Sequence, residues 1–144
     1  MLFRSGDNFG LQLEHIAVED QFRPEVGYVR RPDFRRSFGD VRVSRRTRRS
    51  RTFRRVNLDT SYDYVQNAAR TQVQNKESKT TFNLEMNNSD VAKIGYRLDY
   101  ELLPRNFAIA RGVTVPRGGY TYRAVDTSYA FGQQRRLAGT VSAT

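Results

Sequence analysis

The residues able to support catalysis are few and poorly arranged for it. His15 is the only histidine and the chain has no cysteine, so neither a thiolate nor a multi-histidine metal site can form. Two acidic pairs, Asp59 with Asp63 and Asp99 with Glu101, have the residue types that glycoside hydrolases use. Basic residues share the strand faces of both pairs, which favours ion pairing over acid–base chemistry. We therefore expect no catalytic residue, no cofactor and no metal.

Basic residues are concentrated in an arginine-rich segment, residues 22–55. Its part from 30 to 55 holds twelve arginines and two acids, so it carries the +10 net charge of the whole chain. Acidic and basic residues balance elsewhere. Lysine is rare, whereas electrostatic nucleic-acid arms usually mix lysine and arginine because phosphate accepts either. The planar guanidinium instead suits fixed, hydrogen-bonded positions.

Three interpretations of the arginine-rich segment remain open. Aromatic residues interleave with the arginines, as in a nucleic-acid-binding arm on a compact domain. Residues 45–51 alone also fit a solvated basic loop. We favour a segment inside or at the mouth of a barrel, where arginines pair with carboxylates and with anionic solutes or lipid-A phosphates. The candidates for this anion-binding or lumen-pairing surface are Arg30, Arg31, Arg35, Arg36, Arg42, Arg55 and Arg97.

Length and composition indicate one domain of 144 residues. No apolar run approaches the roughly 18 residues of a transmembrane helix, and the N-terminus lacks the layout of a secretory signal. Leu2–Ser5 reads like a translated sequencing adaptor, so we expect residues 1–9 to be an artefact or a disordered start. The chain stops within an expected strand. We therefore expect residues 10–144 to be an internal piece of a longer protein.

Strict alternation of apolar and polar residues predicts long β-strands joined as hairpins over residues 53–144. We expect strands over 53–65, 70–86, 93–102, 120–131 and 137–143, with a β-bulge near Ala124 where the alternation changes phase. Shorter extended segments are expected over 11–18 and 38–43. Residues 87–90 predict a tight turn. The hairpin of the first two strands is expected to have a turn at 67–69 and a long polar extension over 66–79. The connection over 103–119 is expected to be long, and the other two connections short.

Both faces of these strands are unusual for a soluble sandwich. The apolar face is rich in tyrosine, which favours membrane interfaces. The other face carries charges of both signs, as expected of a barrel lumen. Strands of about 11–13 residues are also long enough to cross a bilayer, which takes roughly 9–11 residues. The tyrosines expected on the apolar face are Tyr62, Tyr64, Tyr96, Tyr100, Tyr120 and Tyr122.

A resemblance to a known family begins at residues 21–46, which read QFRPEVGYVRRPDFRRSFGDVRVSRR. This resembles the NPEVGF-x-RR-x-DFRR segment of a bacterial cell-surface family, with Arg23 where the family has Asn. Similar stretches are FNLEMNNSD, GVTVPRGGYTY and RRLAGTVS, so the likeness spans about residues 10–144. The family carries a module resembling family-9 carbohydrate-binding domains, then an outer-membrane β-barrel of unknown function. The resemblance implies that any glycan binding belongs to a module missing from this chain.

These observations predict an all-β fold, an antiparallel up-and-down meander of about five to seven long strands, open because it is a piece of a transmembrane β-barrel. The expected location of the parent protein is the bacterial outer membrane, with outer-membrane lipid and the remaining strands of its own barrel as partners. The expected role is that of a surface protein associated with carbohydrate binding or uptake. The alternative is a soluble arginine-rich β-domain that binds nucleic acid.

Overall fold

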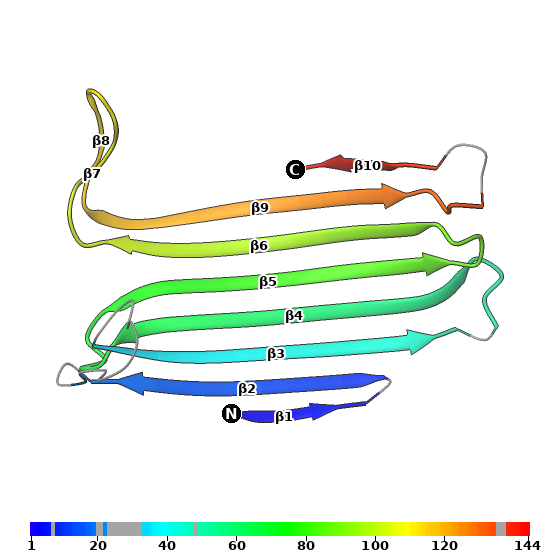
Figure 1. Cartoon of the computed structure of the whole chain (residues 1–144), viewed down its shortest axis with the longest axis horizontal. Coiled ribbons are helices and arrows are strands. Elements are labelled where there is room, and N and C mark those ends of the chain that lie inside the picture. Colours follow the sequence, from blue (N-terminus) through cyan, green and yellow to red (C-terminus); the bar gives the residue numbers. More distant parts are fainter. Residues whose placement is uncertain (7, 20–21, 23–32, 48, 135–137) are drawn as a thin grey trace.

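The computed structural model describes residues 1–6, 8–19, 22, 33–47, 49–134 and 138–144. Ten strands form, and six of them are long (Figure 1). The strands are β1 (Leu2–Ser5), β2 (Phe9–Val18), β3 (Phe34–Arg46), β4 (Phe53–Asn67), β5 (Val73–Met86), β6 (Val91–Leu103), β7 (Phe107–Ala110), β8 (Val113–Val115), β9 (Gly118–Ala130) and β10 (Thr140–Ala143). None of the described residues forms a helix that could cross a membrane.

Eight strands form one antiparallel sheet in the order β1-β2-β3-β4-β5-β6-β9-β10, and β7 and β8 form a separate hairpin in the connection between β6 and β9. The predicted all-β antiparallel meander is thus confirmed, with one strand more than the expected maximum. The predicted extended segment over 38–43 is the centre of the longer β3. The sheet is open, with β1 and β10 at its two edges.

The residues predicted to be an artefact or disordered include β1. Leu2–Ser5 pairs with β2 in an unbroken antiparallel register, from Leu2 opposite Leu13 to Ser5 opposite Gly10. The structure thus assigns these residues an ordered place at the edge of the sheet.

The bulge predicted near Ala124 is wrong. Pairing between β6 and β9 is continuous from Val91 opposite Ala130 to Leu103 opposite Gly118. Unbroken ladder hydrogen bonds therefore prevail over the apolar pattern, and the even-numbered residues of β9 lie on the charged face. Tyr120 and Tyr122, predicted on the apolar face, are opposite Glu101 and Asp99 on the charged face instead. The register shifts of the sheet lie in the β4–β5 pair, close to both ends of β4.

The polar extension of the hairpin predicted over 66–79 is formed mostly by the ends of β4 and β5, which leave residues 68–72 as a turn. The Asn67 side chain closes this turn by accepting hydrogen bonds from the backbone N–H groups of Thr71 (2.9 Å) and Gln72 (3.0 Å). Arg70 takes the left-handed conformation, with φ 60°. The long connections are residues 19–33 and 104–117, both at the same end of the sheet (Figure 1).

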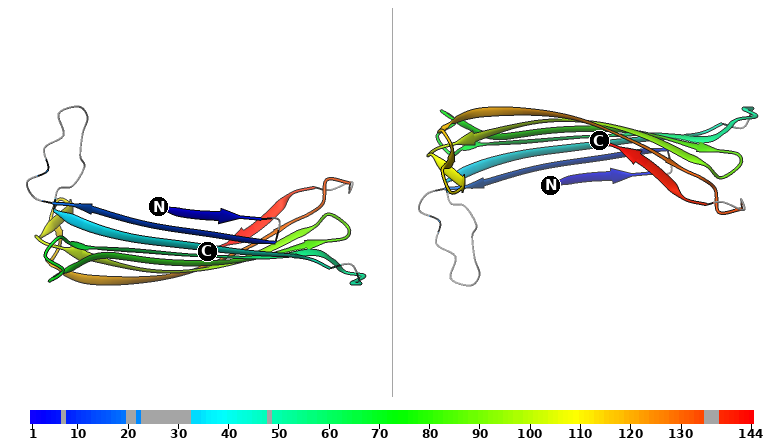
Figure 2. Two further views of the ribbon diagram at one scale, coloured as in Figure 1. Left: turned by 90° about the horizontal axis from the view of Figure 1, so that it is seen from below. Right: turned by 90° about the horizontal axis from the view of Figure 1, so that it is seen from above.

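The sheet is curved into a trough, and both edges bend toward the same side (Figure 2). No hydrophobic side chain among the described residues is buried. The accessible surface is 11541 Å², against about 7,600 Å² for a compact globular protein of this mass. The described residues therefore form a single layer, in which none of them forms a second layer over either face of the sheet.

The fully buried side chain of Asp90 fastens the β5–β6 turn to the end of β9. Its carboxylate accepts hydrogen bonds from the Tyr129 hydroxyl (2.6 Å) and the Gly132 N–H (2.7 Å). It also accepts one from the Asn88 amide (3.0 Å). A Cβ on Gly132 would lie 2.6 Å from the Asn88 carbonyl oxygen, so only glycine fits beside the turn. This contact holds together the end of the sheet opposite the long connections.

Candidate functional site: the charged concave face

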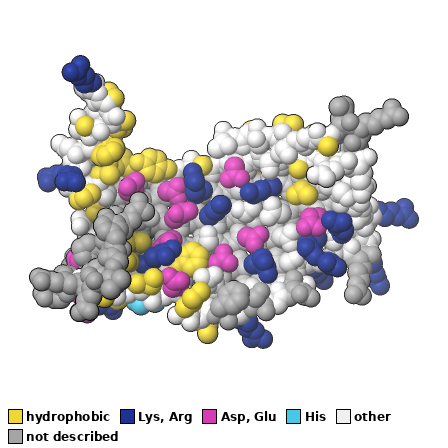
Figure 3. Space-filling view, in the orientation of Figure 1, with side chains coloured by type: hydrophobic (Ala, Val, Ile, Leu, Met, Phe, Trp, Pro, Cys, Tyr) yellow, Lys and Arg dark blue, Asp and Glu magenta, His cyan; other side chains and the backbone are white. Residues whose placement is uncertain are grey.

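All acidic residues of the six long strands lie on one face of the sheet. The registers align them across the strands, because each pair of facing residues points to the same side. This face is the inside of the trough, and basic residues are interspersed with the acids there (Figures 2 and 3). The acids are Glu14, Asp40, Asp59, Asp63, Glu77, Glu85, Asp99, Glu101 and Asp126.

Arg36 is the best-fixed charge on this concave face. Its guanidinium donates to both carboxylate oxygens of Asp63, at 3.0 and 2.6 Å, and lies 3.7 Å from Glu14. The hydrogen bonds that Arg36 donates to Asp63 raise the pKa of its guanidinium, and the nearby negative charges add to the effect. The guanidinium also lies over the Phe38 ring, 5.4 Å from its centre. Strands β2, β3 and β4 are thereby joined through one side chain.

Two further predicted arginines also have carboxylate partners on this face. Arg55 lies 3.8 Å from Glu85, which also binds the neighbouring Arg54 at 3.2 Å. Arg97 binds Asp99 at 3.0 Å within β6. The charges of Arg36 and Arg97 are thus neutralised locally by close carboxylates, whereas Glu85 compensates Arg55 only in part.

The other predicted site residues do not lie together on one face. Arg42 lies on the concave face, directly opposite Asp59. Arg35 lies on the other face, where its Nε donates to the Ala68 carbonyl (3.0 Å) in the β4–β5 turn. Arg30 and Arg31 lie outside the described residues. Arg35 and Arg36 were both predicted to lie on one anion-binding surface, but consecutive residues of a strand point to opposite faces.

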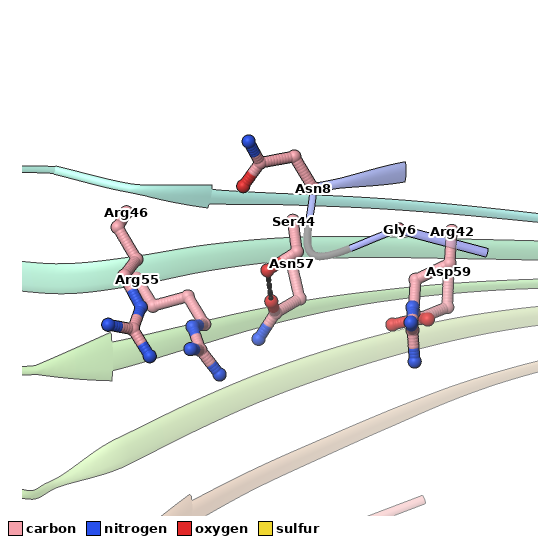
Figure 4. A pocket seen from close by; sticks show the side chains of 8 residues that line it. All are labelled: Gly6, Asn8, Arg42, Ser44, Arg46, Arg55, Asn57 and Asp59. Atoms are coloured by element: carbon pink, nitrogen blue, oxygen red, sulfur yellow. Dashed lines mark hydrogen bonds between the residues drawn. The ribbon is translucent and has the colours of Figure 1, made fainter. Parts of the chain in front are cut away.

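A cavity of about 780 Å³ opens on the concave face at the end away from the long connections. Its lining includes Arg46, which the sequence assigned to a basic loop over residues 45–51 (Figure 4). Because β3 continues to Arg46, this side chain joins Arg42 on the same face; their even spacing is the signal that could have shown it. The lining residues are Gly6, Asn8, Arg42, Ser44, Arg46, Arg55, Asn57 and Asp59.

The convex face is apolar and carries no acid from the six long strands. Its apolar side chains are half exposed, with Ile94 at 50% and Val125 at 51%. The prediction that Tyr62, Tyr64, Tyr96 and Tyr100 lie on this face is confirmed by the register. They gather toward the end with the long connections, where Lys76 Nζ lies 5.6 and 5.8 Å from the ring centres of Tyr64 and Tyr100.

The side chains considered for catalysis do not converge. His15 lies on the convex face, where its Nδ1 is 3.0 Å from the Ser37 hydroxyl. Asp63 is engaged by Arg36, and Asp99 by Arg97. In the part of the chain that the structure describes, no group of three histidine or acidic side chains could hold a metal ion. On the concave face, Asp63 and Asp99 therefore serve as ion-pair partners of arginines.

Comparison of the chain with protein-family models, with curated proteins and with solved structures finds no match.

Proposed function

We propose that this chain forms part of the wall of a bacterial outer-membrane β-barrel, with its concave face toward the lumen and its convex face toward lipid. The observation that carries the proposal is the separation of charge: acids of the long strands occupy the concave face, while most exposed apolar residues of these strands occupy the convex one. Outer-membrane barrels have this arrangement, because lipid accepts apolar side chains and the lumen holds water.

The height of the convex apolar band supports the same proposal. Tyr64 lies at one border of the band, and Phe53, opposite Met86, lies at the other. Between them the facing stretch of β5, from Lys76 to Met86, rises about 33 Å at about 3.3 Å per residue. At the usual strand tilt of about 40° this is about 25 Å of depth, the height of the apolar band in outer-membrane barrels. Tyr129 and Phe131, whose rings meet edge-to-face at 5.1 Å, add aromatic residues at the second border.

The role that follows is structural and solute-related, not catalytic. The paired charges of the concave face would line a watery lumen, and the remaining strands of the barrel would cover both edges of the sheet. The association of the parent protein with carbohydrate binding or uptake rests on the family resemblance alone. Outer-membrane lipid is the partner that the convex face requires.

The nucleic-acid alternative is disfavoured by the surroundings of the strand arginines. Arg36 binds Asp63, and Arg97 binds Asp99, so much of their charge is already neutralised within the sheet. A phosphate backbone would have to compete with these carboxylates.

Fractionation of a Gram-negative host that exports the chain tests the proposal. We expect the protein in the outer-membrane fraction, and we expect it to stay there through a urea wash, because its convex face requires lipid. A soluble folded monomer in plain buffer would refute the barrel. Binding to nucleic acid that weakens steeply with salt would support the alternative.

A further inference from the structure

The cavity on the concave face has a lining that attracts anions. The described residues that line it are three arginines, one aspartate and four uncharged residues, so these residues together carry a net charge of +2. Its volume of about 780 Å³ lies within the range of about 300–1,000 Å³ that is usual for small-molecule sites. The close-up shows the arginines Arg42, Arg46 and Arg55 arranged along one row of side chains (Figure 4).

Two of these arginines are placed against each other. Arg46 and Arg55 are directly opposite in the β3–β4 register. Like charges at such positions destabilise a sheet unless something lies between or beside them. Glu85 compensates Arg55 only in part, at 3.8 Å, because Arg54 is closer to it. Arg46 has no ion pair with any acid in the described part of the chain.

Hydrogen-bond donors dominate the base of the cavity. The Ser44 hydroxyl donates to the Asn57 side-chain oxygen at 2.6 Å, which leaves the amide nitrogen of Asn57 on the side away from Ser44 (Figure 4). The two arginines flank this pair on one side, and Arg42 and Asp59 flank it on the other. Guanidinium groups match the geometry of phosphate and carboxylate oxygens in a bidentate manner.

We propose that this cavity binds a small organic phosphate, with Arg46 and Arg55 holding the phosphate group and the amide of Asn57 assisting them. A phosphate monoester carries about −1.5 to −2 charges at pH 7, which matches the net +2 of the lining, whereas a single carboxylate leaves one positive charge unmatched. The bound anion would also relieve the repulsion between the two arginines. The inference depends on the proposed barrel only for the route by which the ligand arrives.

Calorimetric titration of the full chain in uncharged maltoside micelles tests the inference, with glucose 6-phosphate, glucose and citrate as probes. Glucose 6-phosphate should bind, and Arg46→Gln should weaken it by about tenfold to a hundredfold, as expected for a lost charge-assisted pair. Lys79→Gln is the control, because Lys79 lies on the same face, opposite Ser61, but outside the cavity, and the change should leave binding unchanged.

A second readout does not require the ligand. Without phosphate, Arg46→Gln should raise the urea midpoint, since it removes a like-charge pair, and added glucose 6-phosphate should stabilise the wild type only. If circular dichroism shows that Arg46→Gln does not fold, Arg42→Gln is tested in its place. Equal binding of glucose, tighter binding of citrate, or unchanged binding by Arg46→Gln would overturn the inference. None of these outcomes bears on the proposed barrel, which is tested separately by membrane fractionation.

Discussion

Introducing one charged side chain on the convex face tests whether this face contacts lipid or water. Leu58 lies on this face, 41% exposed, in a row with Val43 and Phe82. It lies near the middle of the band between Phe53 and Tyr64. We expect Leu58→Arg to be strongly destabilising when the protein is folded into phosphatidylcholine vesicles, since the guanidinium would lie close to the bilayer midplane.

The size of the effect follows from that depth. Arginine near the midplane of a barrel costs about 2–4 kcal/mol and near an interface about 0–1 kcal/mol. We take about 3 kcal/mol for Leu58→Arg, which lowers the ratio of folded to unfolded protein by a factor of about 150. With a urea slope of about 2 kcal/mol/M, the unfolding midpoint should fall by about 1.5 M.

The matched control is Ser61→Arg, three residues along the same strand but on the concave face. Ser61 is opposite Asp40 on one side and Lys79 on the other, so an added arginine meets charges of both signs. Its free energy of unfolding should change by less than about 0.5 kcal/mol, in the ordinary range for surface substitutions. The reasoning fails if tyrosine fluorescence shows the two variants unfolding at the same urea concentration.

Three other substitutions test the packing of the sheet by urea unfolding. Asp90→Ala leaves the Tyr129 hydroxyl without its carboxylate acceptor at a buried site; we expect a loss of about 3 kcal/mol, and an effect no larger than that of an exposed-loop alanine would contradict this. Gly95→Ala places a Cβ 2.5 Å from Asp126 Oδ1, so it should destabilise alone and be rescued by Asp126→Ala; no rescue would show that the contact is unimportant. Asn67→Ala removes the acceptor that closes the β4–β5 turn, at a cost of about 1 kcal/mol, and unchanged hydrogen exchange in that turn would refute the assignment.

Much of the fold could be predicted because the alternation in residues 53–102 is regular. The faces of β4, β5 and β6 follow directly from which residues are apolar, and the tight turn over 87–90 follows from its Asn and Asp content. The concentration of arginine in one segment likewise indicated a charged face. These are local properties, since a period of two residues is written in the chain itself.

Other features depend on how one strand aligns with the next. The side of the sheet that Tyr120 and Tyr122 occupy is set by the ladder between β6 and β9, because moving the register by one residue would place them on the other face. The length of β3 similarly depends on pairing with β4, which carries the strand to Arg46.

The candidate site illustrates the same division. The sequence determined that arginines would be plentiful, that carboxylates would share their strands, and that apolar and charged residues would separate onto two faces. Only the tertiary structure placed Arg46 opposite Arg55, put the Ser44–Asn57 hydrogen bond beside them and sent Arg35 to the convex face. Side-chain alternation is a property of one strand, whereas a cavity needs the register of several, which is fixed by hydrogen bonds between residues far apart in the chain.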